Sequence, residues 1–312
     1  MEHGPAAAEL ISDRGAAAAS DDLFRSPAFL AVEGVTHTLR IESPSRTTLI
    51  PVIVRDVDGS ELRDAVSPYG YPGATVDGDG PPPDPGLVDW GPTELISVFV
   101  RDRLGEPSLA GGNRRSTVYL HESGRERGVR QRLAEQVRAA ERAGWAVERT
   151  PGPEAGDKAL RGFESAYEQT MRRASAGERY FFGRDYYRAV LGFRHSWLLS
   201  ARSADGEIGA AAIAATSDGL LHYFLGGTAD ATLGQSPFKN VVVAMLDLAD
   251  ELGVPLNLGG GVEPGDGLER FKRGFANAEL PFVTHQIVCD RDEYERLSAG
   301  IEAGRFFPAY RA

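Results

Sequence analysis

Residues 256–275, LNLGGGVEPGDGLERFKRGF, combine the residue types that most suggest chemistry in this sequence. The apolar run at their start predicts a buried strand, and Gly259, Gly260 and Gly261 follow it directly. Glycines let a ligand approach the backbone closely, and their amide groups can face negative charge that develops on an oxygen atom. These three glycines are therefore candidates for substrate binding.

One lysine, Lys272, follows on a predicted helix between Phe271 and Phe275. A cation held in apolar surroundings can stabilise a tetrahedral intermediate or a phosphate. The alternative is a surface lysine whose aliphatic stem lies along apolar neighbours. The residues by themselves leave both alternatives open.

A second candidate for substrate binding is the turn SPYGYPG at residues 67–73. Tyr69 and Tyr71 stand on either side of a glycine and between two prolines, so both phenols lie on a short, stiff turn. Such phenols can line a pocket and donate hydrogen bonds. The alternative is a turn whose aromatic rings cap the core.

The common patterns of nucleophilic, metal and nucleotide-binding enzymes do not occur in the sequence. It contains no GxSxG, no HExxH, no P-loop lysine motif and no GxGxxG between a strand and a helix. The six histidines are scattered without metal-ligand spacing, and the one cysteine, Cys289, excludes an intramolecular disulfide. We therefore expect neither a metal site nor a bound cofactor.

The elements that must position these residues alternate between helices and antiparallel strands. In the first half, two runs rich in branched residues predict a hairpin, residues 58–92 form a long loop, and residues 125–145 predict a helix. In the second half, a helix pair precedes three strands joined by short turns, and then a strongly amphipathic helix that Ser236 could cap and Gly253 could end. This order indicates an α+β fold.

Length and composition describe an ordinary globular protein. The chain has 312 residues, 42% of them hydrophobic and 25% charged, which favours two domains. We expect a disordered leader over residues 1–20 and domains over residues 21–155 and 156–312, divided at the Pro/Gly-rich linker TPGPEAGD. No apolar stretch is long enough to span a bilayer and no signal sequence is present, so we expect a cytoplasmic protein.

Three features, in this order, resemble the Fem family: the tyrosine turn, the arginine-rich helix predicted over residues 125–145, and the closing GGG...DGLERFKRGF segment. Members of that family have tandem N-acetyltransferase (GNAT) folds and transfer an amino acid from aminoacyl-tRNA to a peptide amine. The resemblance implies a duplicated GNAT fold and amide formation without a cofactor. It also implies that Lys272 stabilises the oxyanion, with Phe271 and Phe275 as its apolar frame and Tyr69 and Tyr71 lining the pocket.

The resemblance further implies an aminoacyl-tRNA partner, although the net charge of −11 argues against a nonspecific nucleic-acid binder. Several arginines lie on or just before the predicted helix, and we expect Arg130 and Arg138 among them to bind tRNA phosphates. The alternative is a solvated helix, because glutamates are interspersed with these arginines.

Two departures from the family refine the expectation. The two ordinary helices in residues 160–195 leave no room for a coiled-coil arm, and this armless build fits the antibiotic-pathway type that extends a peptidyl nucleoside. The segment TADATLGQSPFKN at residues 228–240 lacks the loop with which acyl-CoA enzymes hold pyrophosphate at a helix N-terminus. We therefore expect aminoacyl-tRNA as donor and a small peptide or peptidyl-nucleoside amine as acceptor, with an acyl-CoA-dependent N-acyltransferase as the alternative.

Overall fold

The computed structural model describes residues 6–304 and 306–312. The chain folds into two compact units: unit 1 comprises Met1–Arg115 and Pro281–Ala312, and unit 2 comprises Ser116–Leu280. The chain thus leaves unit 1 once, forms unit 2 and returns. The boundary predicted near residue 155 falls inside unit 2. The last long strand returns to unit 1, where its Thr284 pairs with Arg101. No local sequence pattern predicts a pairing between residues so far apart in the chain.

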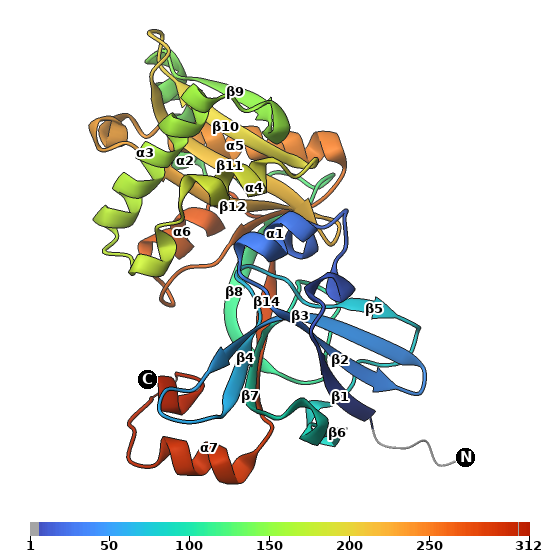
Figure 1. The fold of residues 1–312 in the computed structure, drawn as a ribbon. Coiled ribbons are helices and arrows are strands. Elements are labelled where there is room, and N and C mark those ends of the chain that lie inside the picture. The colour runs from blue at the N-terminus through green and yellow to red at the C-terminus, as the bar shows by residue number, and fades with distance from the viewer. Residues whose placement is uncertain (1–5, 305) are drawn as a thin grey trace. The chain divides into compact units, whose positions relative to one another are not determined.

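Unit 1 is built mainly from strands (Figure 1), which pair in the order β6, β1, β2, β3, β4, β7, β14, with β5 beside β3. The strands are β1 (Ala6–Ile11), β2 (His37–Ser43), β3 (Arg46–Asp56), β4 (Arg63–Val66), β5 (Thr75–Asp77), β6 (Val88–Asp89), β7 (Leu95–Arg101) and most of β14 (Ala278–Val288). The α-helices among the described residues of this unit are α1 (Pro27–Val32) and α7 (Arg291–Ser298). Antiparallel pairing of β2 with β3 confirms the predicted hairpin.

Two predictions for unit 1 are wrong. Residues 6–20 are not a disordered leader: β1 pairs antiparallel with β2, a 3₁₀ helix covers Arg14–Ala17, and the side chains of Ala8 and Ala17 are buried. Residues 1–5 lie outside the described residues. The long loop predicted over residues 58–92 contains three short strands, which are too brief and too rich in charge, Gly and Pro to show a period of two.

Unit 2 holds most of β8 and the strands β9 to β13, which pair in the order β8, β13, β12, β11, β10, β9. Their bounds are β8 (Asn113–His121), β9 (Ala146–Pro151), β10 (Ser196–Arg202), β11 (Ile208–Ser217), β12 (Leu220–Thr228) and β13 (Leu256–Gly259). The helices are α2 (Gln131–Arg142), α3 (Asp157–Arg173), α4 (Arg184–Leu191), α5 (Phe238–Leu252) and α6 (Gly267–Arg273). The predicted helix pair and three-strand meander are thereby confirmed, and α3 and α4 have ordinary lengths.

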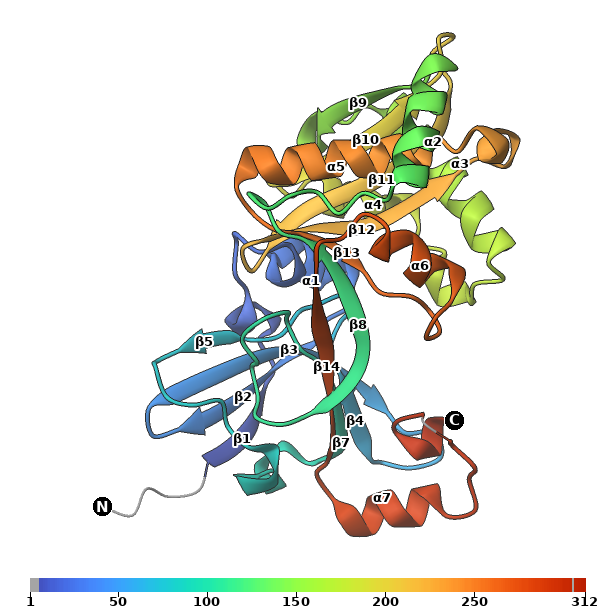
Figure 2. The ribbon, with the colours of Figure 1, turned by 180° about the vertical axis from the view of Figure 1, so that it is seen from behind.

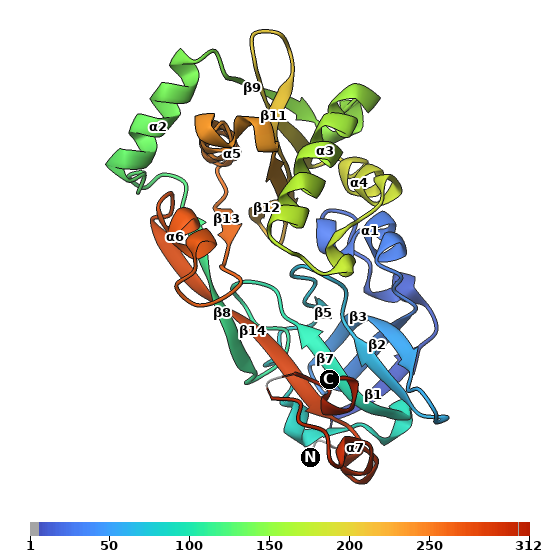
Figure 3. The same cartoon turned by 90° about the vertical axis from the view of Figure 1, so that its left-hand side faces the viewer.

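The sheet of unit 2 is covered on both faces (Figure 3): α3 and α4 lie on one side and α5 on the other. From behind, α5 runs across the strands with α2 beside it (Figure 2). Strand β11 has the sequence IGAAAIAATS, and its small residues bring both helix layers close to the sheet. Because hydrophobic burial scales with the apolar area removed from water, this two-sided packing gives unit 2 a large core.

Helix α5 ends as its sequence predicts and begins differently. Gly253 adopts a left-handed conformation with φ of 68° and stops the helix. The predicted cap by Ser236 is wrong, because Ser236 itself has φ of 55° and its hydroxyl donates to the carbonyl of Leu233. Within the described part of the chain, no helix is long and apolar enough to cross a membrane.

The close packing of α3 on β12 depends on Gly227. A Cβ atom at this position would lie 2.3 Å from the backbone oxygen of Ala166 in α3, so the helix would have to move. We expect Gly227→Ala to lower the free energy of unfolding by about 1–3 kcal/mol, the usual cost of overpacking a core. Urea denaturation of the purified chain measures this change.

Gly234→Ala is the matched control. Gly234 is exposed, and an added Cβ would meet no heavy atom within 4 Å. The free energy of unfolding of this variant should stay within about 0.5 kcal/mol of the wild type. Equal stability of the two variants would contradict the described contact between α3 and β12.

Candidate functional site

The residues predicted to carry chemistry in the second half of the chain gather at the end of β13. This strand pairs parallel with β12 at two positions, Leu221 with Leu256 and His222 with Asn257. The chain then turns through the glycines and enters α6, which carries Lys272. The candidate site therefore lies where two neighbouring parallel strands cease to pair.

The ammonium group of Lys272 is the chemical centre of this site. Its Nζ donates a hydrogen bond to the carbonyl oxygen of Gly260 at 2.9 Å and lies 5.5 Å from the ring centroid of Tyr223 on β12. Burial lowers the pKa of Lys272 to about 8, although the nearby carboxylate of Asp266 opposes that shift. Within the described residues no carboxylate lies at ion-pair distance, so the ammonium keeps two N–H donors for another acceptor.

The three glycines are required by packing within the protein. Gly259 has φ of 77°, which favours glycine. A Cβ atom on Gly260 would lie 2.5 Å from the backbone oxygen of Thr117 on β8, and one on Gly261 would lie 2.7 Å from Oδ1 of Asp266. These contacts explain the glycines without a ligand, and the predicted role of Gly259, Gly260 and Gly261 in substrate binding stays a prediction.

A buried polar pair fixes the turn that leads into these glycines. Oδ1 of Asn257 accepts from the amide of Gly259 at 2.8 Å, so its Nδ2 faces Nδ1 of His222 at 3.1 Å. Nε2 of His222 therefore carries the hydrogen and faces the carbonyl of Ser217 at 3.2 Å. Burial lowers the pKa of His222 to about 4, so the ring stays neutral at neutral pH.

Helix α6 is held at its start by Asp266. Oδ1 of Asp266 accepts from the amide of Glu269 at 2.6 Å, and its Oδ2 accepts from the amides of Val262 and Glu263 at 2.7 and 3.0 Å. Glu269 in turn accepts from the hydroxyl of Tyr119 on β8 at 2.9 Å. These contacts fix the helix that presents Lys272, since a capped first turn leaves fewer backbone amides unsatisfied.

An aromatic chain surrounds the aliphatic part of the site. The ring of Phe271 lies 5.3 Å from that of Phe275 and 6.2 Å from that of Phe238, and Tyr223 lies 5.7 Å from Phe238. Phe275 is fully buried in the core, so it supports the frame from inside and does not face an open pocket. Phe271 is half-buried and stays a candidate for contact with substrate.

Sequence reasoning found Lys272 and its phenylalanines but missed Tyr223, Asn257, His222 and Tyr119. One signal was available: Asn257 is a polar residue in the middle of a short apolar run, and a buried polar group needs a partner. The other three belong to strands that reach the site only through the sheet. Their sequence neighbours are apolar and predict nothing more than strands.

The tyrosine turn belongs to unit 1. Gly70 has φ of 88°, and a Cβ atom there would lie 2.3 Å from the ring of Phe24. The ring of Tyr71 packs against Phe24 at 5.8 Å and Phe282 at 4.8 Å, whereas Tyr69 is 36% exposed. The ring of Tyr71 thus caps a part of the core of unit 1, and the predicted role of both tyrosines in lining the pocket stays a prediction.

The arginines on and before α2 fall into two groups. Arg125 pairs with Glu122, and Arg127 pairs with two aspartates of α5. The other four are exposed and form no ion pair within the described residues: Arg130, Arg132, Arg138 and Arg142. The backbone amide of Arg130 donates to the carbonyl of Gly274 at 3.0 Å, which ties the start of α2 to the end of α6.

One family model matches a part of the chain that includes Lys272. Residues 127–273, all of them in unit 2, match the family model described as an acetyltransferase (GNAT) domain. The sequence matches no curated protein.

Solved structures share the fold over most of the chain. FemX superimposes with a TM-score of 0.64 at 11% identity, covering 88% of this chain and 94% of its own. L-PGS from Bacillus licheniformis gives a TM-score of 0.53 at 14% identity, covering 84% and 87%, respectively. A conserved protein of unknown function from Bacteroides thetaiotaomicron gives 0.55 at 11% identity, covering 86% and 92%. The predicted α+β fold of GNAT type is thereby confirmed.

The neutral state of His222 predicts a pH dependence of stability. Its pKa is about 4 in the folded chain and 6.5 when unfolded, so between these values the unfolded chain binds the extra proton. Stability should therefore be unaffected above pH 6.5 and decrease as pH falls towards 4, by about 3 kcal/mol in total. Urea denaturation at pH 7 and pH 4 measures this loss in the wild type.

The variant His222→Gln supplies the comparison, because Gln offers hydrogen-bonding groups but does not titrate. It should lose about 3 kcal/mol less than the wild type over the same pH interval, while other histidines contribute equally to both chains. An identical loss in both chains would show that His222 is not held neutral.

Proposed function

We propose that this chain is an aminoacyltransferase that moves an amino acid from aminoacyl-tRNA to the free amine of a small peptide or peptidyl acceptor. The observation that carries the proposal is the Lys272 ammonium group, which is held by a carbonyl and an aromatic ring and lacks a carboxylate partner within the described residues. Such a cation can receive the negative charge that forms on a carbonyl oxygen during acyl transfer.

The reaction needs no side-chain nucleophile. The amine nitrogen attacks the ester carbonyl carbon, the new C–N bond forms, and the C–O bond to the tRNA ribose breaks. The proton lost by the amine goes to the leaving ribose oxygen, directly or through water. Lys272 donates an N–H to the oxyanion, and the fixed α6 holds that donor in place during the reaction.

The donor is proposed from charge and resemblance. The exposed arginines on and just before α2, Arg138 and Arg130 among them, form no ion pair within the described part of the chain and are available to tRNA phosphates. The resemblance to the Fem family and the fold shared with FemX support the same donor. In this proposal Tyr69, Tyr71 and Phe271 contact the acceptor or the aminoacyl group, and the reaction takes place in the cytoplasm without a cofactor.

An acyl-CoA-dependent N-acyltransferase is the second candidate, because the matching family model describes an acetyltransferase domain. The same lysine could stabilise the oxyanion formed from a thioester. Against it stands the segment between β12 and α5, where a short 3₁₀ helix, Asp230–Gln235, occupies the place of the glycine-rich loop expected in acyl-CoA enzymes.

For the aminoacyltransferase, a peptidyl-nucleoside acceptor from antibiotic biosynthesis would fit the absence of a coiled-coil arm.

A panel of donors distinguishes the two candidates. The purified chain is incubated with radiolabelled aminoacyl-tRNAs or acyl-CoAs and with candidate peptide and nucleoside amines, with and without ribonuclease. We expect label to enter an amide product from aminoacyl-tRNA, and ribonuclease treatment of the donor to abolish this transfer. Transfer that survives ribonuclease and requires a CoA thioester would establish the second candidate.

Lys272→Met should lower kcat by about 10²–10³, the usual effect of removing one donor to an oxyanion. Methionine preserves the apolar packing of the stem, so the variant should remain folded. Turnover with the active donor and the far-ultraviolet circular dichroism spectrum together measure both effects.

Lys158→Met is the matched control, since Lys158 is an exposed lysine on α3. This variant should retain the turnover of the wild type. Near-normal turnover of Lys272→Met would remove Lys272 from the reaction, even if aminoacyl-tRNA proved to be the donor.

A further inference from the structure

The segment 257–277 carries the candidate site and has an asparagine at each end. Asn257 lies on β13 and contacts His222 on β12, whereas Asn277 follows α6 and contacts His121 on β8. In both pairs Nδ2 of the asparagine faces Nδ1 of the histidine, at 3.1 Å and 3.3 Å, respectively. Strands β12 and β8 flank β13 in the sheet of unit 2. The same kind of side-chain pair thus ties each end of the segment to a strand beside β13.

Asn257 uses both polar atoms of its amide group. Its Oδ1 accepts from the backbone amide of Gly259 and fixes the glycine turn, while its Nδ2 donates to His222. Nε2 of His222 donates to the carbonyl of Ser217. Asn257 and His222 are both buried, so water does not compete for these hydrogen bonds. The turn that presents the carbonyl of Gly260 is therefore tied to β12.

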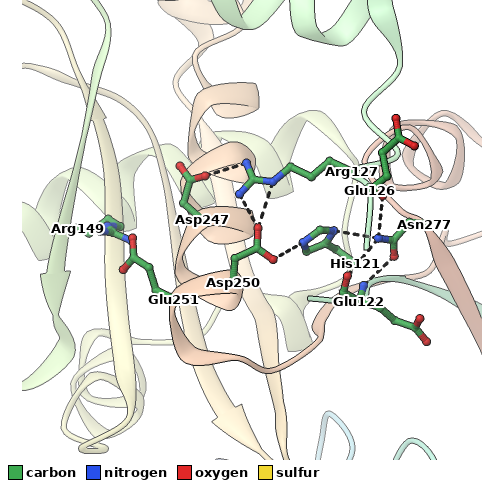
Figure 4. A network of polar contacts seen from close by, with 9 residues as sticks. All are labelled: His121, Glu122, Glu126, Arg127, Arg149, Asp247, Asp250, Glu251 and Asn277. Carbon is green, nitrogen blue, oxygen red and sulfur yellow. Dashed lines mark hydrogen bonds and ion pairs between the residues drawn. The ribbon is translucent and has the colours of Figure 1, made fainter. Parts of the chain in front are cut away.

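Asn277 uses its amide group in the same way at the other end (Figure 4). Its Oδ1 accepts from the backbone amide of Glu122 at 2.7 Å, so its Nδ2 faces Nδ1 of His121. Nε2 of His121 therefore carries the hydrogen and donates to Asp250 on α5 at 2.8 Å. Burial of Asp250 acts against its ionisation, but the hydrogen bonds from His121 and Arg127 outweigh it and lower the pKa, so Asp250 stays a charged acceptor. The end of α6 is thereby tied to β8 and, through His121, to α5.

The middle of the segment has few directional ties to the rest of unit 2. Val262 is 82% exposed, and the hydrogen bonds of Asp266 join residues of the segment to one another. Phe275 packs in the apolar core, but hydrophobic contact does not specify orientation. The hydroxyl of Tyr119 donates to Glu269 and adds one directional bond from β8. The two asparagine pairs therefore supply directional bonds that the apolar packing lacks.

We propose that Asn257 and Asn277 are positioning residues for the reaction at Lys272. They fix the glycine turn and the end of α6, and thereby hold the ammonium group against the carbonyl of Gly260 with its other N–H donors available to the oxyanion. The inference rests on the proposed acyl transfer. Neither asparagine contacts Lys272 within the described residues, so both act through the segment between them.

Asn257→Leu and Asn277→Leu test the kinetic consequence. Leucine has nearly the size of asparagine but no polar side-chain atom, so each variant removes one pair. With the donor that the panel identifies, kcat should fall by about tenfold or more while KM changes less than about twofold, because a misplaced oxyanion donor acts in the transition state. Serine variants at the same positions leave room for water to satisfy the freed polar groups, and they serve if leucine does not fold.

Two further variants are the controls. Asn113→Leu makes the same replacement at an exposed asparagine on β8. Gly227→Ala lowers the stability of unit 2 at the contact between β12 and α3, away from the segment 257–277. Both variants should retain the kcat of the wild type. An equal loss of kcat in Gly227→Ala would show that lost stability, and not lost positioning, lowers the rate.

The ¹³Cε resonance of Lys272 gives a second readout that needs no donor. The chain has three lysines, so Lys272→Met assigns this resonance in protein labelled with ¹³C-lysine. Burial lowers the pKa of Lys272 to about 8, and a loosened segment admits water to the ammonium group. The titration midpoint should therefore rise by about one pH unit in both leucine variants and stay unchanged in both controls.

The two readouts separate this proposal from the proposed function. Wild-type kcat or a wild-type titration midpoint in the folded asparagine variants would overturn the positioning role. The midpoint still shows whether the asparagines hold Lys272 if neither aminoacyl-tRNA nor acyl-CoA supports turnover. Failure of the proposed function therefore cannot conceal the result.

Discussion

The tight turn through Gly259, Gly260 and Gly261 is the constraint on which the candidate site depends. The Gly260 backbone lies against the carbonyl of Thr117 on β8, and Gly261 lies against Asp266 at the start of α6. This close approach turns the chain away from β12 as soon as β13 has paired with it at two positions. The carbonyl oxygen of Gly260 is therefore available to accept a hydrogen bond from the ammonium group of Lys272 on α6.

Charge is distributed unevenly over unit 2. Several of its arginines engage carboxylates, as Arg127 and Arg149 do, and such pairs bring surface helices and strands together. Lys272 and the exposed arginines of α2 have no such partner within the described residues, in a chain whose net charge is −11. In an acidic protein, cations without carboxylate partners are the groups available to an external anion or a developing oxyanion.

The first turn of α5 contacts both the aromatic frame around Lys272 and helix α2. Phe238 contacts Tyr223 and Phe271 in that frame, whereas Nδ2 of Asn240 donates to the carbonyl of Val137 on α2. Two residues apart on a helix, their side chains leave the axis about 200° apart, so one turn contacts both regions. The buried residue Asn257 also links two parts of unit 2, because it contacts His222 on β12 and the amide of Gly259 in the glycine turn.

The sequence by itself determined the elements whose pattern is local. The hairpin of β2 and β3, the strands β10 to β12 and the end of α5 at Gly253 follow from periodicity and turn residues that lie next to one another in the chain. It also identified Lys272, because a lysine after three glycines is visible without any fold. Only the tertiary structure decided the limits of the two units, the strand at residues 6–11, and the partners of Lys272. Gly260 and Tyr223 meet this lysine through sheet pairing and helix packing, and such contacts between distant segments leave no periodic trace in the sequence.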